Sequence, residues 1–251
     1  SMQICGADGL YTGAASNSGK ARHNTMKTPR LTKRLEAAAD FVRQGAVIAD
    51  VGTDHAYLPI FLCLSGKAKG GVASDIHKGP LRRAESNLRS YGLSETVDTV
   101  LCDGLDGLER WQPTDILILG MGGELISDII LRAEFTRSAG VRLILQPMTH
   151  PEILRRALYR NGYTVSDETL AEEDGRIYQI LCAEYTGQSE SLTPCELLIG
   201  KHNLRKNTET CRKLLRHWQS VLQKRIDGIR KSGKDAGKET ALLREMEEYL
   251  S

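Results

Sequence analysis

The sequence contains no apolar run that approaches the roughly 20 residues needed for a membrane-spanning helix, and no apolar secretory signal near its first residues. We therefore expect a cytoplasmic protein without a membrane partner. Its six cysteines include no Cys-x-x-Cys pair, which favours reduced thiols over a disulfide framework. The six histidines show no metal-ligand spacing, so we expect no metal ion.

The length of 251 residues allows one α/β domain with an appendage. A net charge of +2 hides an uneven distribution along the chain. Between Lys201 and Lys231, ten basic residues face two acidic ones, an excess of eight positive charges. Such a stretch is a candidate contact surface for a polyanion, although basic helices are more often simply solvated.

The first 25 residues are rich in Gly, Ser, Asn and Ala and lack sustained periodicity, so we expect a disordered N-terminal extension or tag. A helical pattern then begins at Thr28, a possible N-cap, with Pro29 in the first turn.

Apolar runs alternate with helical patterns over residues 26–187, which we take as one domain. The predicted strands span residues 47–51, 71–74, 98–102, 115–119, 142–145, 163–169 and 177–185. Five alternating β/α units predict a parallel sheet with helices on both faces. The last two strands predict a hairpin that adds one antiparallel edge strand. The result is an α/β, Rossmann-like sheet of seven strands, the outline of a class I methyltransferase.

After Pro194 the pattern becomes helical. Apolar residues at alternating spacings of three and four form one seam, which is typical of a coiled-coil-like helix. The seam residues are Cys211, Leu215, Trp218, Leu222 and Ile229. Residues 232–237 interrupt the pattern, and a shorter helix follows. We therefore predict a basic, antiparallel helical hairpin as a second domain over residues 188–251.

The strongest local signal is the segment 49–58, Ala-Asp-Val-Gly-Thr-Asp-His-Ala-Tyr-Leu, directly after the first strand. Ligands of open α/β sheets bind beyond the carboxyl end of such a strand. Gly52 allows a tight turn, whereas Asp54 and Ala56 replace the next glycines of a dinucleotide-binding loop. The carboxylates of Asp50 and Asp54 would repel a diphosphate and suit the two cationic groups of S-adenosylmethionine. Asp54 is equally plausible as a helix cap.

Acidic residues also follow the next two strands. Asp75 lies 25 residues after Asp50, where an acidic side chain accepts ribose hydroxyls; a helix cap before Pro80 is the alternative. After the third strand, the Asp103 carboxylate would accept an adenine amino group, and Gly104 would let the backbone approach the ligand.

Three glycines and a methionine, Gly120-Met121-Gly122-Gly123, follow the fourth strand. They predict a flat backbone wall against which a base inserts, beside the methyl group to be transferred. A tight strand–helix turn, the other interpretation, needs only one glycine.

These segments, in this order, resemble the bacterial tRNA adenine-22 N1-methyltransferases. The resemblance is carried by Arg-Leu-Thr-Lys-Arg-Leu at 30–35, the segment 49–59, Ser-Asp-Ile at 74–76, Cys-Asp-Gly-Leu at 102–105, the glycines at 120–123 and Glu-Asp-Gly-Arg-Ile-Tyr-Gln-Ile at 173–180. It implies methylation of adenine N1 in tRNA with S-adenosylmethionine as the cofactor. The predicted cofactor-binding residues are Asp50, Gly52, Thr53, His55, Asp75, Ile76, Asp103 and Gly104. The predicted catalytic residues are Asp54, Gly120, Met121 and Gly122.

The same resemblance implies that tRNA is the partner and that the helical tail helps to hold it. The predicted RNA-binding residues are Arg30, Arg34, Lys201, Arg205, Lys206, Arg212, Lys213 and Arg216. A monomer is favoured. The alternatives are a methyltransferase acting on another RNA site, a protein or a small molecule, and a nonenzymatic RNA-binding protein with this fold. A nicotinamide dehydrogenase is disfavoured by Asp54 and Ala56.

Overall fold

The computed structural model describes residues 28–251, so the extension predicted for residues 1–25 lies outside the described residues. The strands are β1 (Ala46–Val51), β2 (Ala68–Asp75), β3 (Val97–Leu101), β4 (Asp115–Gly122), β5 (Arg142–Thr149), β6 (Tyr163–Glu173) and β7 (Arg176–Tyr185). The α-helices are α1 (Lys33–Phe41), α2 (Tyr57–Leu64), α3 (Lys78–Ser90), α4 (Gly123–Arg132), α5 (Pro151–Arg160), α6 (Pro194–Ile199), α7 (Lys201–Lys206), α8 (Glu209–Lys231) and α9 (Gly237–Leu250). Two 3-10 helices are η1 (Leu108–Trp111) and η2 (Glu134–Arg137).

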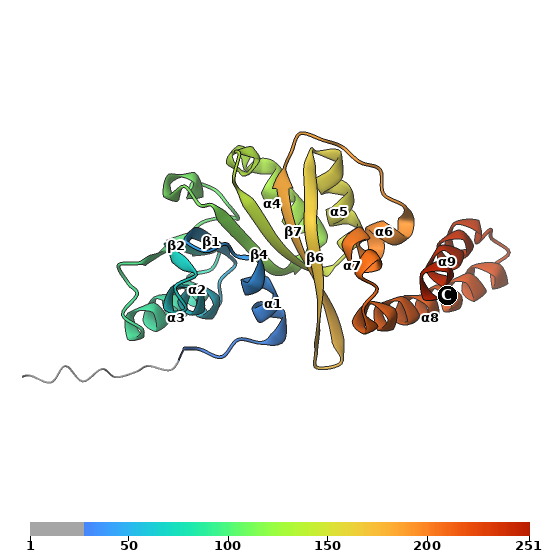
Figure 1. The fold of residues 1–251 in the computed structure, drawn as a ribbon, viewed down its shortest axis with the longest axis horizontal. Helices are drawn as coiled ribbons and strands as arrows, with labels where there is room; N and C mark the ends of the chain where they lie inside the picture. Colours follow the sequence, from blue (N-terminus) through green and yellow to red (C-terminus); the bar gives the residue numbers. More distant parts are fainter. Residues whose placement is uncertain (1–27) are drawn as a thin grey trace, which may run out of the picture.

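The seven strands form one sheet in the order β3-β2-β1-β4-β5-β7-β6 (Figure 1). Strands β1 to β5 pair in parallel, and β7 runs antiparallel to both of its neighbours. The predicted seven-stranded sheet with one antiparallel strand is therefore confirmed. The prediction that the antiparallel strand forms the edge is wrong, because β7 inserts between β5 and β6 and leaves β6 outermost.

Both faces of the sheet are covered, so its central strands read as continuous apolar runs. In β4, Ile116 and Ile118 pack into the core under α4 and α5, while Leu117 faces the core under α1 and α2. The strand order reverses between β1 and β4, which places the ligand crevice of such folds beyond their carboxyl ends.

The first helix begins later than predicted. Residues 28–32 are not helical, and α1 starts at Lys33 after the extended residue Thr32. The physical reason lies in Leu31, whose side chain is 6% exposed and anchors this extended segment to the core under α1 and α2.

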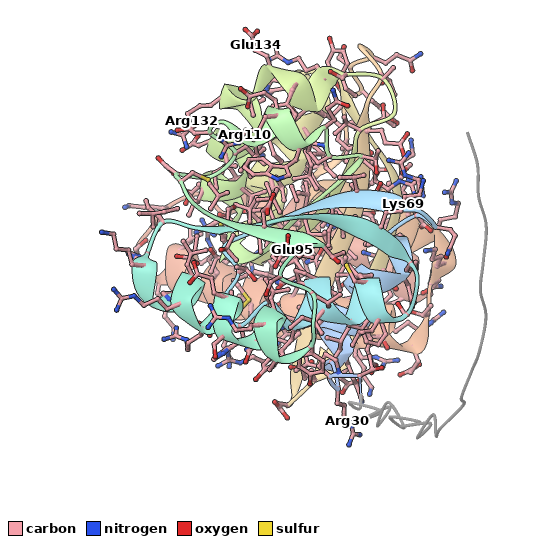
Figure 2. All side chains as sticks on the ribbon, turned by 90° about the vertical axis from the view of Figure 1, so that its left-hand side faces the viewer. Arg30, Lys69, Glu95, Arg110, Arg132 and Glu134 are labelled. Carbon is pink, nitrogen blue, oxygen red and sulfur yellow. The ribbon has the colours of Figure 1, made fainter. Side chains whose placement is uncertain are left out.

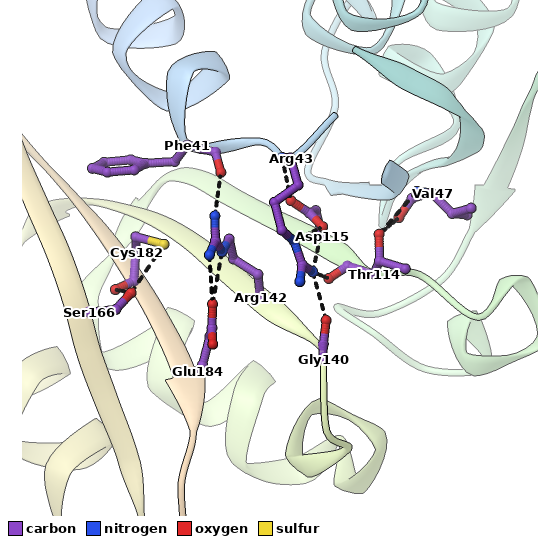
Figure 3. A network of polar contacts seen from close by, with 10 residues as sticks. All are labelled: Phe41, Arg43, Val47, Thr114, Asp115, Gly140, Arg142, Ser166, Cys182 and Glu184. Carbon is purple, nitrogen blue, oxygen red and sulfur yellow. Dashed lines mark hydrogen bonds and ion pairs between the residues drawn. The ribbon is translucent and has the colours of Figure 1, made fainter. Parts of the chain in front are cut away.

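A polar network fixes the amino ends of β4 and β5, opposite the crevice (Figure 3). The fully buried carboxylate of Asp115 accepts hydrogen bonds from the backbone N–H and the guanidinium of Arg43, at 2.9 and 2.7 Å. Arg142 similarly bonds Glu184 across the β5–β7 pair at 2.9 Å. The charged groups of this network all have hydrogen-bonding partners within the protein, so they need no ligand.

The helical tail packs against the sheet through α6, α7 and α8 and ends in the α8–α9 hairpin (Figure 1). Leu215 and Leu222 of α8 share a core with Met246 of α9, which confirms the predicted helical hairpin. The short helices α6 and α7 precede it. Coiled-coil geometry and the domain boundary at residue 188 stay predictions. Within residues 28–251, no helix has the length and apolarity to cross a membrane.

The side chain of Arg155, on α5, joins the sheet to this tail. It is fully buried, and its Nε donates to Glu168 Oε1 on β6 at 2.6 Å. Its other nitrogens donate to Gln179 Oε1 on β7 at 2.7 Å and to the carbonyl oxygens of residues 197–199, at the end of α6. One guanidinium thus binds a buried carboxylate and satisfies carbonyls that a helix end leaves without partners.

Gly200 lets the tail approach this ion pair closely. Its φ of +101° favours glycine, and a Cβ atom here would lie 2.3 Å from the Glu168 carboxylate. The backbone N–H of His202 then donates to the second carboxylate oxygen of Glu168 at 3.1 Å.

We expect Glu168→Gln to lower the free energy of unfolding by about 3–5 kcal/mol, because it leaves a buried guanidinium without its counter-charge. Asp167→Asn is the matched control, since the neighbouring Asp167–Lys206 pair is exposed and worth about 1 kcal/mol or less. Urea unfolding of both variants measures the difference. Equal losses in the two variants would contradict the role assigned to Arg155 and Glu168.

Candidate active site

The crevice lies beyond the carboxyl ends of β1, β2 and β4. The backbone N–H groups of Gly52 and Thr53 both donate to the carbonyl oxygen of Ser74, at 2.8 and 2.9 Å, which ties the loop after β1 to the end of β2. The N–H of Cys102 donates to the carbonyl of Asp75 at 3.2 Å and ties the next loop to the same strand. The structure therefore brings the three predicted cofactor segments to one edge of the sheet.

Asp50 is the buried carboxylate of this edge, with 7% of its surface exposed. Its pKa is raised to about 6, chiefly because burial disfavours the charged form; a hydrogen bond with the Thr53 side chain opposes this shift, and the charge of Asp75 adds to it. A carboxyl group that loses so much hydration without a cationic partner is typical of a ligand site.

Gly52 and Met121 bring the β1 loop into contact with β4. Gly52 has a φ of +76°, and a Cβ atom there would lie 2.3 Å from the terminal methyl carbon of Met121. Any side chain at residue 52 would thus displace Met121. The predicted cofactor loop and the predicted base wall are direct neighbours.

Asp54 is 62% exposed at its side chain and bonds two neighbours. Arg83 of α3 donates to one carboxylate oxygen at 2.5 Å, and the other lies 3.1 Å from His55 Nε2. The hydrogen bond from Arg83 is the main reason that the pKa of Asp54 is lowered. Asp54 is therefore ionised, and it does not cap α2, whose N-cap is Ala56. Arg83 was not predicted as a site residue, because no motif in α3 distinguishes it from an ordinary surface arginine.

His55 stacks on the ring of Tyr57, with ring centroids 5.3 Å apart. Asp75 accepts a hydrogen bond from the backbone N–H of His77 at 2.7 Å. Asp75 is not the N-cap of α3, which is His77 itself. The side chain of Ile76 is 58% exposed beside it and offers an apolar surface at the crevice.

Asp103 lies after β3, 3.3 Å from the guanidinium of Arg132 at the end of α4. Gly104 has a φ of +58°, and a Cβ atom there would lie 3.0 Å from Ile129. Figure 2 labels Arg132, at the end of α4, and Arg110, in η1. The predicted glycine is thus required by its backbone conformation and by the close approach of α4.

The segment Gly120–Gly122 is not a loop after β4, as predicted, but part of the strand. Met121 and Gly122 continue the pairing with β5, opposite Pro147 and Thr149, and α4 begins at once at Gly123. A Cβ atom at residue 123 would lie 2.3 Å from the carbonyl oxygen of His150. Gly123 thus allows two backbones to pack closely, whereas the backbone wall for a base stays a prediction.

Arg34 of α1 lies at this wall, near Gly120. Its Nη1 donates to Gln146 Oε1 at 3.1 Å, and its guanidinium lies 5.8 Å from the centre of the Tyr178 ring. Gln146 is buried within β5 and was not predicted, because a lone glutamine is no sign of a site. Arg30, by contrast, is exposed, at the opposite end of Figure 2 from Glu134.

The six predicted RNA-binding cations of the tail all have partners within the chain. Lys206 bonds Asp167 at 2.6 Å, Lys213 bonds Glu172 at 2.9 Å, and Arg216 bonds Glu209 at 3.2 Å. The other three contacts are Lys201 with Glu190, Arg205 with His202, and Arg212 with the carbonyl of Leu250. The carboxylate pairs are exposed and of the kind that contributes little to stability.

Among residues 28–251, no three His, Cys, Asp or Glu side chains are grouped so as to hold a metal ion.

The sheet with its antiparallel strand and the crevice edged by three aspartates define a Rossmann-like class I methyltransferase. Residues 31–181 match the methyltransferase domain family. The tRNA (adenine(22)-N(1))-methyltransferase of Bacillus subtilis is 39% identical over 159 residues, which are 63% of this chain and 67% of that protein.

Two streptococcal crystal structures are also similar. One, from Streptococcus agalactiae and described as a member of the NADB-Rossmann superfamily, has a TM-score of 0.81 and 31% identity over 91% of this chain and all of that chain. The other is a candidate tRNA (m1A22) methyltransferase of Streptococcus pneumoniae in complex with S-adenosyl-L-methionine. It has a TM-score of 0.77 and 32% identity over 88% of this chain and all of that chain. The chain belongs to the tRNA (adenine(22)-N(1))-methyltransferase family, whose cofactor is S-adenosylmethionine.

The raised pKa of Asp50 predicts a characteristic pH dependence. Between pH about 4 and about 6, Asp50 is protonated in the native state and ionised in the unfolded chain. The free energy of unfolding therefore falls as the pH rises through this window. Asp50→Asn removes this titration and should gain stability over the wild type across that window, up to about 3 kcal/mol above it. Chemical unfolding from pH 4 to 8 measures this.

Asp40→Asn, a change at an exposed carboxylate of α1 that leaves Asp50 intact, should keep the wild-type pH dependence. An Asp50→Asn variant that follows the wild-type curve in parallel would show that Asp50 is not the titrating group.

Proposed function

We propose that this chain transfers the methyl group of S-adenosylmethionine to N1 of adenine 22 in tRNA. The observation that carries the proposal is the contact between Gly52 and Met121, which sets a crevice lined with carboxylates directly beside a backbone wall. The carboxylates suit the cationic methyl donor, and the backbone wall suits the flat base. The Bacillus subtilis relative is a tRNA (adenine(22)-N(1))-methyltransferase, and we take the modified nucleotide and atom from it.

The side chains at the crevice fit the cofactor. S-adenosylmethionine, when bound, supplies an activated methyl group on a cationic sulfur. The carboxylate of Asp50, buried without a cationic partner, suits a cationic ammonium group, and Asp75 suits hydroxyl donors. Asp103 and Gly104 would meet the adenine amino group after β3. A dinucleotide diphosphate fits badly, because it would face the same carboxylates.

The wall of β4 orients the substrate base. N1 lies on the Watson–Crick edge of adenine, so the base must leave its pair or be presented from a loop. The glycines at 120 and 122 put no side chain in the way of a flat ring. Proximity and orientation are worth roughly 7–11 kcal/mol in favourable systems, and a single displacement by the N1 lone pair requires no protein nucleophile.

The product is a cationic adenine, so a carboxylate beside the ring stabilises the charge as it develops. Asp54 is the residue we assign to this role, because its lowered pKa keeps it ionised. Its bond to Arg83 lies in exposed surroundings, where a partner is exchanged at little cost.

The tRNA backbone would meet cations on both sides of the crevice. Arg30 and Arg34 lie on the α1 side, and the basic residues of α7 and α8 lie on the other side of the β6–β7 hairpin (Figure 1). Exchange of exposed carboxylate partners for phosphates would release these cations to the RNA. Such contacts position the substrate without reading its sequence.

The activity is tested with labelled S-adenosylmethionine and unmodified tRNA, followed by nucleoside analysis and mapping. We expect N1-methyladenosine at position 22, and no incorporation into a tRNA with guanine at that position. Methylation of another nucleotide, a protein or a small molecule would overturn the assigned substrate. Tight cofactor and RNA binding without any incorporation would identify a nonenzymatic RNA-binding protein.

The role of Asp54 is tested separately. Asp54→Ala should lower kcat at least about tenfold, the loss expected when about 1.4 kcal/mol of transition-state stabilisation is removed. Its dissociation constant for the cofactor, measured by calorimetry, should stay at the wild-type value. Arg83→Gln is the matched control, since it removes the partner and keeps the carboxylate. Unchanged turnover in Asp54→Ala would exclude the role.

A further inference from the structure

A cleft of about 1080 Å³ separates the sheet from the helical tail. Its lining comes from the end of β5 and the start of α5, the turn and first residues of β7, and one side of α8. None of the predicted cofactor or catalytic residues lines it. Its volume is at the upper end of ordinary ligand sites, which hold roughly 300–1,000 Å³, and is enough for more than one nucleotide unit.

The cleft begins where the base wall ends. Thr149, in its lining, has its hydroxyl oxygen 3.2 Å from the position of a Cβ atom on Gly122. Pro147, also in the lining, pairs with Met121. Tyr178 lines the cleft as well, under the guanidinium of Arg34. A polymer whose reacting unit lies against the wall therefore continues into this cleft.

The lining carries an excess of positive charge, four Lys and Arg side chains against the carboxylates of Glu152 and Glu172, which fits a polyanion. The side chains of Arg156 of α5 and Arg176 of β7 form no ion pair or hydrogen bond with any residue in the described part of the chain. Lys213 and Arg225 add two more cations, each with a carboxylate partner, at 2.9 and 3.3 Å. The two arginines without partners are thus available to phosphate groups.

The aromatic side chain of Trp218 supplies a surface for a base. It lies on α8 in the cleft lining, half-buried, with one side packed on the core of the helical tail. The exposed ring of His217 meets it edge-on, with ring centroids 5.9 Å apart. An indole fixed on one side and open on the other is a platform on which bases of any sequence stack.

We propose that this cleft binds the single-stranded nucleotides that flank the target adenine, with one base stacked on Trp218 and phosphates bound by Arg156 and Arg176. The inference rests on the proposed function, since RNA is the occupant to which it commits. The stack would hold the strand in a splayed conformation, in which the target base reaches the wall. An unstacked, splayed strand is the form in which proteins commonly recognise RNA.

The first test uses the fluorescence of Trp218. The sequence has two tryptophans, so Trp111→Phe leaves Trp218 as the only reporter. We expect unmodified tRNA to quench its emission along the same curve as binding measured by anisotropy of labelled tRNA. Emission that is unchanged at saturating tRNA would overturn the proposal.

The second test compares two substitutions of the same residue. Trp218→Leu and Trp218→Phe both keep an apolar side chain against the helical core, but only Phe keeps a ring for stacking. We expect the KM for tRNA to rise by roughly tenfold in the Leu variant and by less than threefold in the Phe variant, because loss of a stack weakens binding on that scale. kcat should change little in either. Equal effects of the two variants would overturn the stacking role.

The arginines are tested by the salt dependence of tRNA binding. Arg156→Gln and Arg176→Gln should each lower the slope of log K against log salt by about 0.7–0.9, the value of one lost phosphate contact. Arg160→Gln, one turn along α5 and outside the cleft lining, is the control and should leave the slope unchanged. Equal slopes for all three variants would contradict the proposed phosphate contacts of Arg156 and Arg176.

Two outcomes distinguish the methylation activity from RNA binding in the cleft. Methylation of adenine 22 without quenching of Trp218 would support the proposed activity and contradict RNA binding in the cleft. Quenching by tRNA that is methylated elsewhere would keep the cleft and overturn the substrate assignment.

Discussion

The ion pair of Arg155 and Glu168 is the constraint on which the arrangement of the two halves depends. A buried charge is tolerated only with a partner and with full hydrogen bonding, and here the partners come from α5, β6, β7 and the end of α6. The sheet and the helical tail are therefore fixed relative to each other by groups that neither half contains alone. This one guanidinium is therefore a fully buried part of the contact that holds the tail beside the crevice.

The two edges of the sheet differ in how their buried aspartates are paired. At the amino ends of the strands, Asp115 is buried with its charge matched by Arg43, and the network is complete without a ligand (Figure 3). At the carboxyl ends, Asp50 is buried, and within residues 28–251 Thr53 is the one side chain that bonds it, while Asp75 repels it. The same side chain is structural at one edge of the sheet and destabilising at the other. That imbalance disposes the crevice toward a cationic ligand.

Most of the fold was predictable because hydrophobic periodicity reports burial, and β4 and β5, covered on both faces, read as apolar runs. Where the sequence misled, long-range contacts overrode local signals. Leu31 is held extended by the core, although Thr28 and Pro29 resemble a helix start. The glycines at 120–122 look like a turn, yet pairing with β5 keeps them in the strand. Arg83, Gln146 and the partners of the tail cations could not be found from the sequence, because only the tertiary fold brings them to their partners.

The contact between Gly52 and Met121 also restricts how this family can diverge. A side chain at position 52 requires both a backbone that tolerates a φ of +76° and the removal of the Met121 methyl group from its place. The two positions lie 69 residues apart in the sequence, yet a side chain at position 52 requires Met121 to move or change as well. A substitution on the predicted cofactor side of this contact thereby also reaches the predicted wall for the substrate base.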